Sequence, residues 1–175
     1  MDLSGYQPFA AGLTGPLREA PRALAQDHFD RLLAARPERR RQLAALWHRH
    51  GGPAEPDALD ADDAPTRLGA WLTTALPALV TDDLAQAAIV VDLALWLGDR
   101  IIARAPQLAW HLLVEPKKAT GYQRPVLVGF TRVTTPRYYV DVAHLVASWA
   151  RLAARGRPAK ADFLQTIEAV TLADA

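Results

Sequence analysis

The chain of 175 residues contains no cysteine, which excludes disulfides, thiolate metal sites and a cysteine nucleophile. Its only two serines, Ser4 and Ser148, do not lie in a Gly-x-Ser-x-Gly motif. A Gly-rich phosphate loop and a His-Glu-x-x-His motif are also missing. No motif therefore identifies a reaction, and we predict no catalytic residue, no metal site and no cofactor.

Long hydrophobic runs are missing as well. The most apolar stretch, residues 84–97, is shorter than the roughly 20 residues that a membrane span needs, and Asp92 interrupts it. Residues Met1 to Gly5 have neither a basic start nor an apolar core, so we expect no signal peptide. We therefore expect a cytoplasmic protein that has no contact with a membrane.

The residues that are present favour one helical domain. Half of the chain is apolar, and its length suits a single core. Alanine, leucine and arginine are abundant and favour helices. We expect residues 1–16 to form an irregular N-terminal arm and residues 17–175 to form a single globular domain.

Hydrophobic spacing defines the elements of this domain. It predicts helices over residues 21–35, 37–50, 65–79, 82–104, 138–154 and 160–172. Thr81 and Asp82 are favourable residues for the start of the fourth helix. Residues 108–114 and 125–130 are typical of two strands, and the polar connection between them favours an antiparallel pair. The predicted fold is mostly α (α+β), with five to six helices around a buried central helix and a small antiparallel β-hairpin.

Within the central predicted helix, residues 82–104, the stretch 87–97 is apolar on every side except at Asp92. Such a helix is normally buried, and burying an unpaired carboxylate costs several kcal/mol. We therefore expect Asp92 to pair with an arginine or to accept hydrogen bonds from backbone amides. Asp99 lies seven residues later on the same face, and we expect it to be solvated near Arg100.

A second interpretation of these carboxylates is chemical. Asp141 and His144 are spaced to share one face of a helix, and such a pair can bind a metal or orient an imidazole. If His111 and His144 converged with Asp92, a metal site or a general base would result. The candidate polar core or site comprises Asp92, Asp99, His111, Asp141 and His144. A small metal-dependent enzyme or ligand binder would use Asp92, Asp99, His111 and His144.

The net charge of +1 conceals a strong segregation of charge. Residues 1–50 carry eight basic and five acidic side chains, residues 51–100 carry two and nine, and residues 101–175 carry ten and five. The candidate acidic binding residues are Asp57, Asp60, Asp62 and Asp63, in a segment, 53–64, that we expect to be a mobile surface loop. The candidate basic binding residues are Lys117, Lys118, Arg124, Arg132 and Arg137. This polarity can steer a charged partner; alternatively, it is a solvated surface on which the two signs lie near each other.

The segment 130–139 combines arginine, threonine and aromatic residues, which can stack bases and contact phosphates. A weak nucleic-acid-binding protein would use Lys117, Lys118, Arg132 and Arg137. Alternatively, Tyr138 and Tyr139 simply begin a helix. The isoelectric point of about 8.2 is low for a dedicated nucleic-acid-binding protein, which argues against a nucleic acid as the partner.

One arrangement of residues resembles that of a known group of proteins. It comprises Leu97-Gly98-Asp99, then Pro106, then Trp110 on a strand, then Gln123-Arg124-Pro125-Val126-Leu127. This arrangement, over about 30 of the 175 residues, resembles uncharacterised small bacterial cytoplasmic proteins, some of which are immunity proteins encoded beside secreted toxins. The resemblance implies a fold more than an activity and carries over no catalytic residue.

We therefore expect a non-enzymatic cytoplasmic bacterial protein whose partner is another protein, in an immunity or adaptor role. Its contact surface would be the acidic loop 55–63 or the basic loop 115–124.

Overall fold

The structure is a computed structural model that describes residues 3–9, 15–55, 57–79, 83–154 and 160–175. A short 3₁₀ helix, η1, spans Leu17–Glu19. The α-helices are α1 (Arg22–Ala34), α2 (Arg36–Arg49), α3 (Ala64–Leu79), α4 (Asp83–Arg104), α5 (Val142–Ala154) and α6 (Phe163–Asp174). The two strands are β1 (Ala109–Leu112) and β2 (Pro125–Val128).

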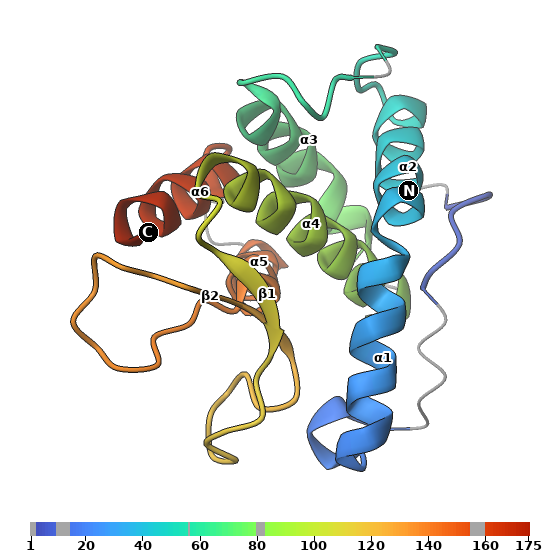
Figure 1. The fold of residues 1–175 in the computed structure, drawn as a ribbon. Coiled ribbons are helices and arrows are strands. Elements are labelled where there is room, and N and C mark those ends of the chain that lie inside the picture. The colour runs from blue at the N-terminus through green and yellow to red at the C-terminus, as the bar shows by residue number, and fades with distance from the viewer. Residues whose placement is uncertain (1–2, 10–14, 56, 80–82, 155–159) are drawn as a thin grey trace.

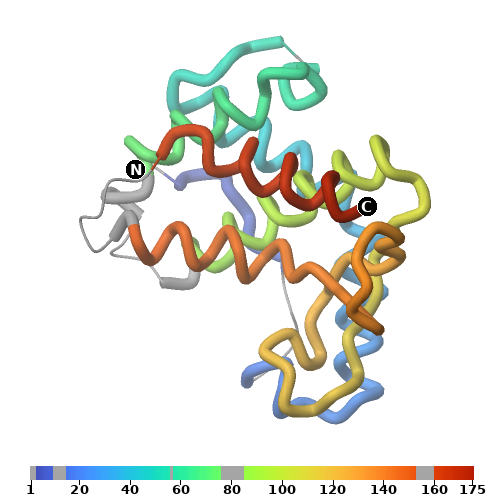
Figure 2. Tube along the Cα trace, turned by 90° about the vertical axis from the view of Figure 1, so that its left-hand side faces the viewer, coloured from blue at the N-terminus to red at the C-terminus, as the bar shows by residue number. Residues whose placement is uncertain are grey.

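Helix α4 lies at the centre of the molecule and packs against α2, α3, α5 and α6 (Figure 1). The two strands form a separate antiparallel hairpin below the end of α4, and α1 lies alongside it (Figures 1 and 2). The prediction of a mostly helical fold with a small antiparallel hairpin is confirmed. Thr81 and Asp82, the predicted helix start, lie outside the described residues.

The central position of α4 follows from its apolar repeat. Ile89, Leu93, Leu97 and Ile101 recur every four residues and are all almost fully buried. Each such side chain stabilises the fold by about 1.5–3 kcal/mol when it leaves water. None of the described helices is long and apolar enough to cross a membrane.

The hairpin is shorter than the sequence pattern predicts. Its register pairs Ala109 with Val128 and Leu112 with Pro125. Beyond Val128 the chain turns at Gly129, whose φ is +102°. A Cβ atom there would lie 2.3 Å from the carbonyl oxygen of Gln107, so only glycine fits this close approach.

Two features of the fold differ from prediction, the start of α5 and the packing of the N-terminal arm. Helix α5 begins at Val142, so Tyr138 and Tyr139 belong to the segment that precedes it and do not start the helix. In the predicted arm, Tyr6 is buried in the main core with residues of α2, α3 and α4. A part of the arm is therefore packed as core, although it has no regular secondary structure.

Candidate functional site

Asp92 is held in a buried network that occupies both of its oxygens. Arg39 of α2 donates from Nε to Oδ1 at 2.8 Å and from Nη2 to Oδ2 at 2.6 Å. The hydroxyl of Tyr6 donates to Oδ2 at 2.5 Å. Burial and the nearby carboxylate raise the pKa of Tyr6, so its hydroxyl remains a donor. The expectation that Asp92 pairs with an arginine is confirmed, and the hydrogen bonds of this carboxylate join α4 to α2 and to Tyr6 inside the core.

Asp99 keeps 37% of its side chain exposed, as expected of a solvated carboxylate, but its ion-pair partner is Arg36 and not Arg100. Its Oδ1 accepts hydrogen bonds from Arg36 Nη1 at 2.7 Å and from Trp110 Nε1 at 2.9 Å. Trp110 lies on β1, and its ring seats against Gly98, which brings the indole N–H to Asp99. Asp99 therefore joins the central helix to α2 and to the hairpin.

The Asp-x-x-His spacing is explained by a helix cap. Asp141 Oδ1 accepts the backbone N–H of His144 at 2.8 Å, as a residue that precedes a helix commonly does. Its other oxygen lies 3.3 Å from Arg124 Nη1. His111 is exposed on β1. The convergence of His111, His144 and Asp92 that a metal site would have required is not found, and the described part of the chain contains no group of three or more histidine or acidic residues that could hold a metal ion.

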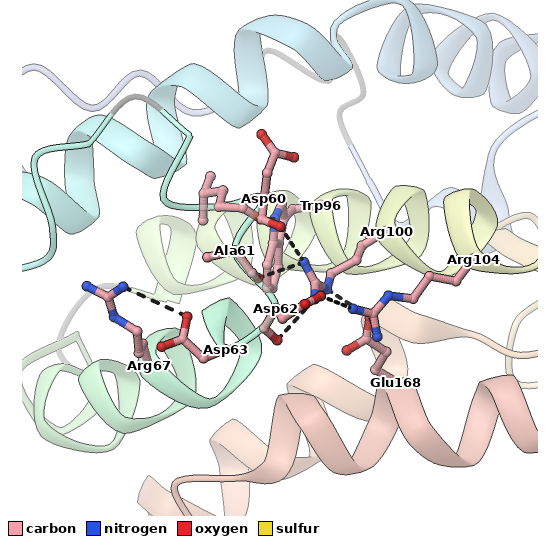
Figure 3. Close-up of polar contacts among 10 residues, drawn as sticks. Asp60, Ala61, Asp62, Asp63, Arg67, Trp96, Arg100, Arg104 and Glu168 are labelled. Carbon is pink, nitrogen blue, oxygen red and sulfur yellow. Dashed lines mark hydrogen bonds and ion pairs between the residues drawn. The ribbon is translucent and has the colours of Figure 1, made fainter.

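Residues 57–63 of the acidic loop 55–63 lie among arginine side chains from the neighbouring helices (Figure 3). Asp60 pairs with Arg40 at 2.7 Å, and Asp62 pairs with Arg104 at 2.8 Å. Opposite charges that are separated in the sequence thus lie together in space, which agrees with the interpretation of a solvated surface of mixed sign. Asp57 is exposed, and Asp63 lies 3.9 Å from Arg67.

Arg100 attaches this loop to the helical core. Its guanidinium donates to the carbonyl oxygens of residues 60, 61 and 62 and, through Nε, to buried Glu168 of α6 at 2.8 Å (Figure 3). Trp96 Nε1 also donates to the carbonyl oxygen of Leu59 at 3.1 Å. The sequence-based expectation of a mobile loop did not include these contacts, because they come from residues about 40 positions away.

Replacing Arg100 by methionine is expected to release the acidic loop. The loss of these donors leaves loop carbonyls unpaired and leaves buried Glu168 with the more distant Arg104 at 3.4 Å. We expect several-fold faster proteolytic cleavage within residues 57–63, with a stability loss of about 1–3 kcal/mol. Arg67→Met is the matched control, since its exposed ion pair with Asp63 should leave the cleavage rate unchanged. Equal cleavage rates in the two variants would contradict this role of Arg100.

A large cleft, which we call the hairpin cleft, lies beside the loop that connects the two strands. It has a volume of about 1180 Å³. Its walls come from the start of α1, from the loop between the strands and from residues 135–139. The loop between the strands and the start of α1 lie side by side in both views (Figures 1 and 2). A second cavity of about 490 Å³ shares the wall formed by residues 135–139 and extends to His111 and Phe130.

Gln123 joins two walls of the cleft. Its side-chain Nε2 donates to the carbonyl oxygens of Leu17 at 2.6 Å and Ala20 at 2.9 Å. Its backbone has a φ of +57°, a conformation that is uncommon for residues other than glycine. Gln123 is almost fully buried, and sequence reasoning missed it because nothing in the local pattern marks it.

Tyr138 supports the third wall. Its ring packs edge-on against Phe130, with 5.1 Å between the ring centroids, and its hydroxyl donates to Asp174 of α6 at 2.9 Å. Burial, together with the hydrogen bond to Asp174, raises the pKa of Tyr138. The segment that carries Arg137 is therefore held against α6.

The charge of the cleft is mainly positive. Arg22, Lys117 and Arg137 line it, together with one carboxylate, that of Glu115. Glu115 lies 4.0 Å from Arg137, and both side chains are highly exposed, at 76% and 85%. Within the described residues, Arg22 and Lys117 form no ion pair. Three tyrosines, Tyr122, Tyr138 and Tyr139, complete the wall.

The structure separates the basic residues that the sequence grouped together. Lys117 and Arg137 line the cleft, whereas Lys118 and Arg132 are exposed outside it. Arg124 is half-buried and pairs with Asp141, so it belongs to the packing between the hairpin and α5.

Comparison of the chain with models of protein families, with curated proteins and with solved structures finds no match.

Proposed function

We propose that this chain is a non-enzymatic protein-binding protein, of the immunity or adaptor kind, and that the hairpin cleft is its contact surface. The observation that carries the proposal is the presence of arginine and lysine beside three tyrosines in one large cleft. Tyrosine and arginine are enriched in protein interfaces, where they supply contact area and directed hydrogen bonds. A bacterial cytoplasmic setting is part of the same proposal.

The partners of the acidic groups also favour binding over chemistry. Asp92 is bonded to Arg39 and Tyr6, and Asp99 is bonded to Arg36 and Trp110. General acid–base work needs a carboxyl group that can reach a substrate and exchange a proton with it. Asp92 is buried and cannot reach a substrate, and the described residues contain no group of three or more acidic or histidine side chains that could hold a metal ion. We therefore do not favour the alternative of a metal-dependent enzyme built on Asp92, Asp99, His111 and His144.

The test is affinity capture from the source organism with two charge-reversal variants. Lys117→Glu/Arg137→Glu changes the cleft, and Lys118→Glu/Arg132→Glu makes the same change of charge outside it. We expect one discrete protein to be retained by the wild type and by the control variant and to be lost with the cleft variant. For an immunity role, co-expression should also neutralise that protein if it is toxic.

Two results would overturn the proposal. One is equal retention of the partner by both variants, which would place the contact elsewhere. The other is capture of RNA or DNA alone in a salt-sensitive manner, which would favour the nucleic-acid-binding hypothesis.

A further inference from the structure

We infer that the hairpin cleft takes an extended protein segment rich in aspartate and glutamate. This inference rests on the proposed function and names the chemistry of the partner. It is carried by the charge of the cleft, by its size and by the way its tyrosines are held.

Basic side chains line the hairpin cleft on several sides. Arg22, Lys117 and Arg137 come from three different segments of the cleft wall, so positive charge is distributed around the cleft. Arg22 and Lys117 form no ion pair among the described residues, and the Arg137–Glu115 contact is at 4.0 Å between exposed groups. Such an exposed ion pair contributes little to stability, so Arg137 can readily exchange Glu115 for a carboxylate of a partner. The cleft can therefore accept several carboxylates without first losing a strong internal ion pair.

The volume of the hairpin cleft also favours a chain segment over a small molecule. Pockets for small molecules commonly measure about 300–1,000 Å³. The hairpin cleft, at about 1180 Å³, is larger than this range, and a second cavity of about 490 Å³ shares the lining residues Glu115, Arg137 and Tyr138 with it. The cleft alone has room for a chain segment, whereas a single small anion would occupy a fraction of it.

The remaining groups favour a peptide over a single-stranded nucleic acid. Glu115 lies in both cavities, where it would repel a continuous phosphate backbone, whereas a peptide can place a neutral residue or a backbone N–H at that point. Tyr138 packs edge-on against Phe130 and is fixed by its hydrogen bond to Asp174, so it is oriented as a wall of the cleft.

The experiment measures the binding of short fluorescent peptides by anisotropy, with the whole chain as the receptor. The acidic probe alternates glutamate with leucine, and the matched probes replace every glutamate by glutamine or by lysine. We expect only the acidic probe to bind, with affinity that falls as salt increases. Lys117→Ala/Arg137→Ala should weaken its binding by roughly tenfold, because two exposed charge contacts are removed. Lys118→Ala/Arg132→Ala should bind as the wild type does.

Three results would overturn the inference. The first is equal binding of the acidic and glutamine probes. The second is an equal loss of affinity for the acidic probe in the cleft variant and in the control variant. The third is tighter binding of a single-stranded oligothymidine than of the acidic probe. Inorganic phosphate is the competitor that distinguishes anion binding in general, and complete displacement at millimolar phosphate would also contradict recognition of a segment. If the acidic probe fails while the cleft variant still loses its captured partner, the inference fails and the proposed function stands.

Discussion

Replacing Arg39 by methionine is expected to lower the free energy of unfolding by about 3–5 kcal/mol, the usual cost of removing one member of a buried ion pair. The change leaves the carboxylate of Asp92, which is only 1% exposed, without its two guanidinium donors. It also removes the donor to the carbonyl oxygen of Gln7. The measurement is chemical denaturation of the wild type and the variant.

Two further variants distinguish this mechanism from a general loss of charge. Arg41→Met, on the same helix, removes an arginine whose one ion-pair partner among the described residues is exposed Glu38, and it should leave the denaturation midpoint unchanged. Arg39→Met/Asp92→Leu removes both charges and should be more stable than Arg39→Met alone, because no buried charge then lacks its partner. A double variant as unstable as the single one would show that the cost comes from lost packing or from the Tyr6 hydroxyl, which loses its acceptor, rather than from the stranded carboxylate.

The network around Asp92 could be predicted from the sequence only in part. A single carboxylate in an apolar helix requires a partner, so the existence of a partner for Asp92 was predictable. The identity of the partners was not, because Arg39 and Tyr6 lie 53 and 86 residues away in the chain. Tyr6 also lies in a segment without a helical or strand period, which made it look like part of a loose arm.

The candidate site was predictable only as a collection of charges. Lys117 and Lys118 are neighbours of the same residue type, yet only the first lines the cleft. The path of the loop decides between them, and that path depends on the left-handed backbone of Gln123 and on its hydrogen bonds to the segment before α1. Hydrophobic periodicity contains no information about such irregular backbone. The acidic loop shows the same limit, since its arginine partners come from three other helices.

The cleft and the core are coupled through the hairpin. Trp110 of β1 donates to Asp99 of α4, and Leu112 packs against Ala25 and Phe29 of α1. The loop that carries Lys117 follows β1 directly. A change at the contact between α4 and β1 should therefore affect both the stability of the fold and the shape of the cleft.

Replacing Gly98 by alanine is expected to destabilise the protein by about 1–3 kcal/mol, the usual cost of overpacking a core. The direction of the change in stability is diagnostic, because the same substitution at an unconstrained helix position would stabilise the protein by up to about 1 kcal/mol. The new Cβ atom would lie 2.1 Å from Cζ2 and 2.6 Å from Cη2 of Trp110, so the indole must move. That movement would disrupt the hydrogen bond from Trp110 to Asp99 and displace β1. Denaturation midpoints measure the first effect, and weaker binding of the acidic peptide measures the second.

Space for the indole, rather than the loss of glycine itself, should determine the result. In Gly98→Ala/Trp110→Leu, the smaller side chain leaves room for the Cβ atom, so the double variant should be more stable than the sum of the single effects allows. Gly15→Ala is the control, because a Cβ atom at Gly15 would meet nothing within 4 Å. A Gly98→Ala variant that is more stable than the wild type would mean that the indole adjusts without cost. The hairpin would then be held to α4 by the hydrogen bond from Trp110 to Asp99 and not by the close approach of Trp110 to Gly98.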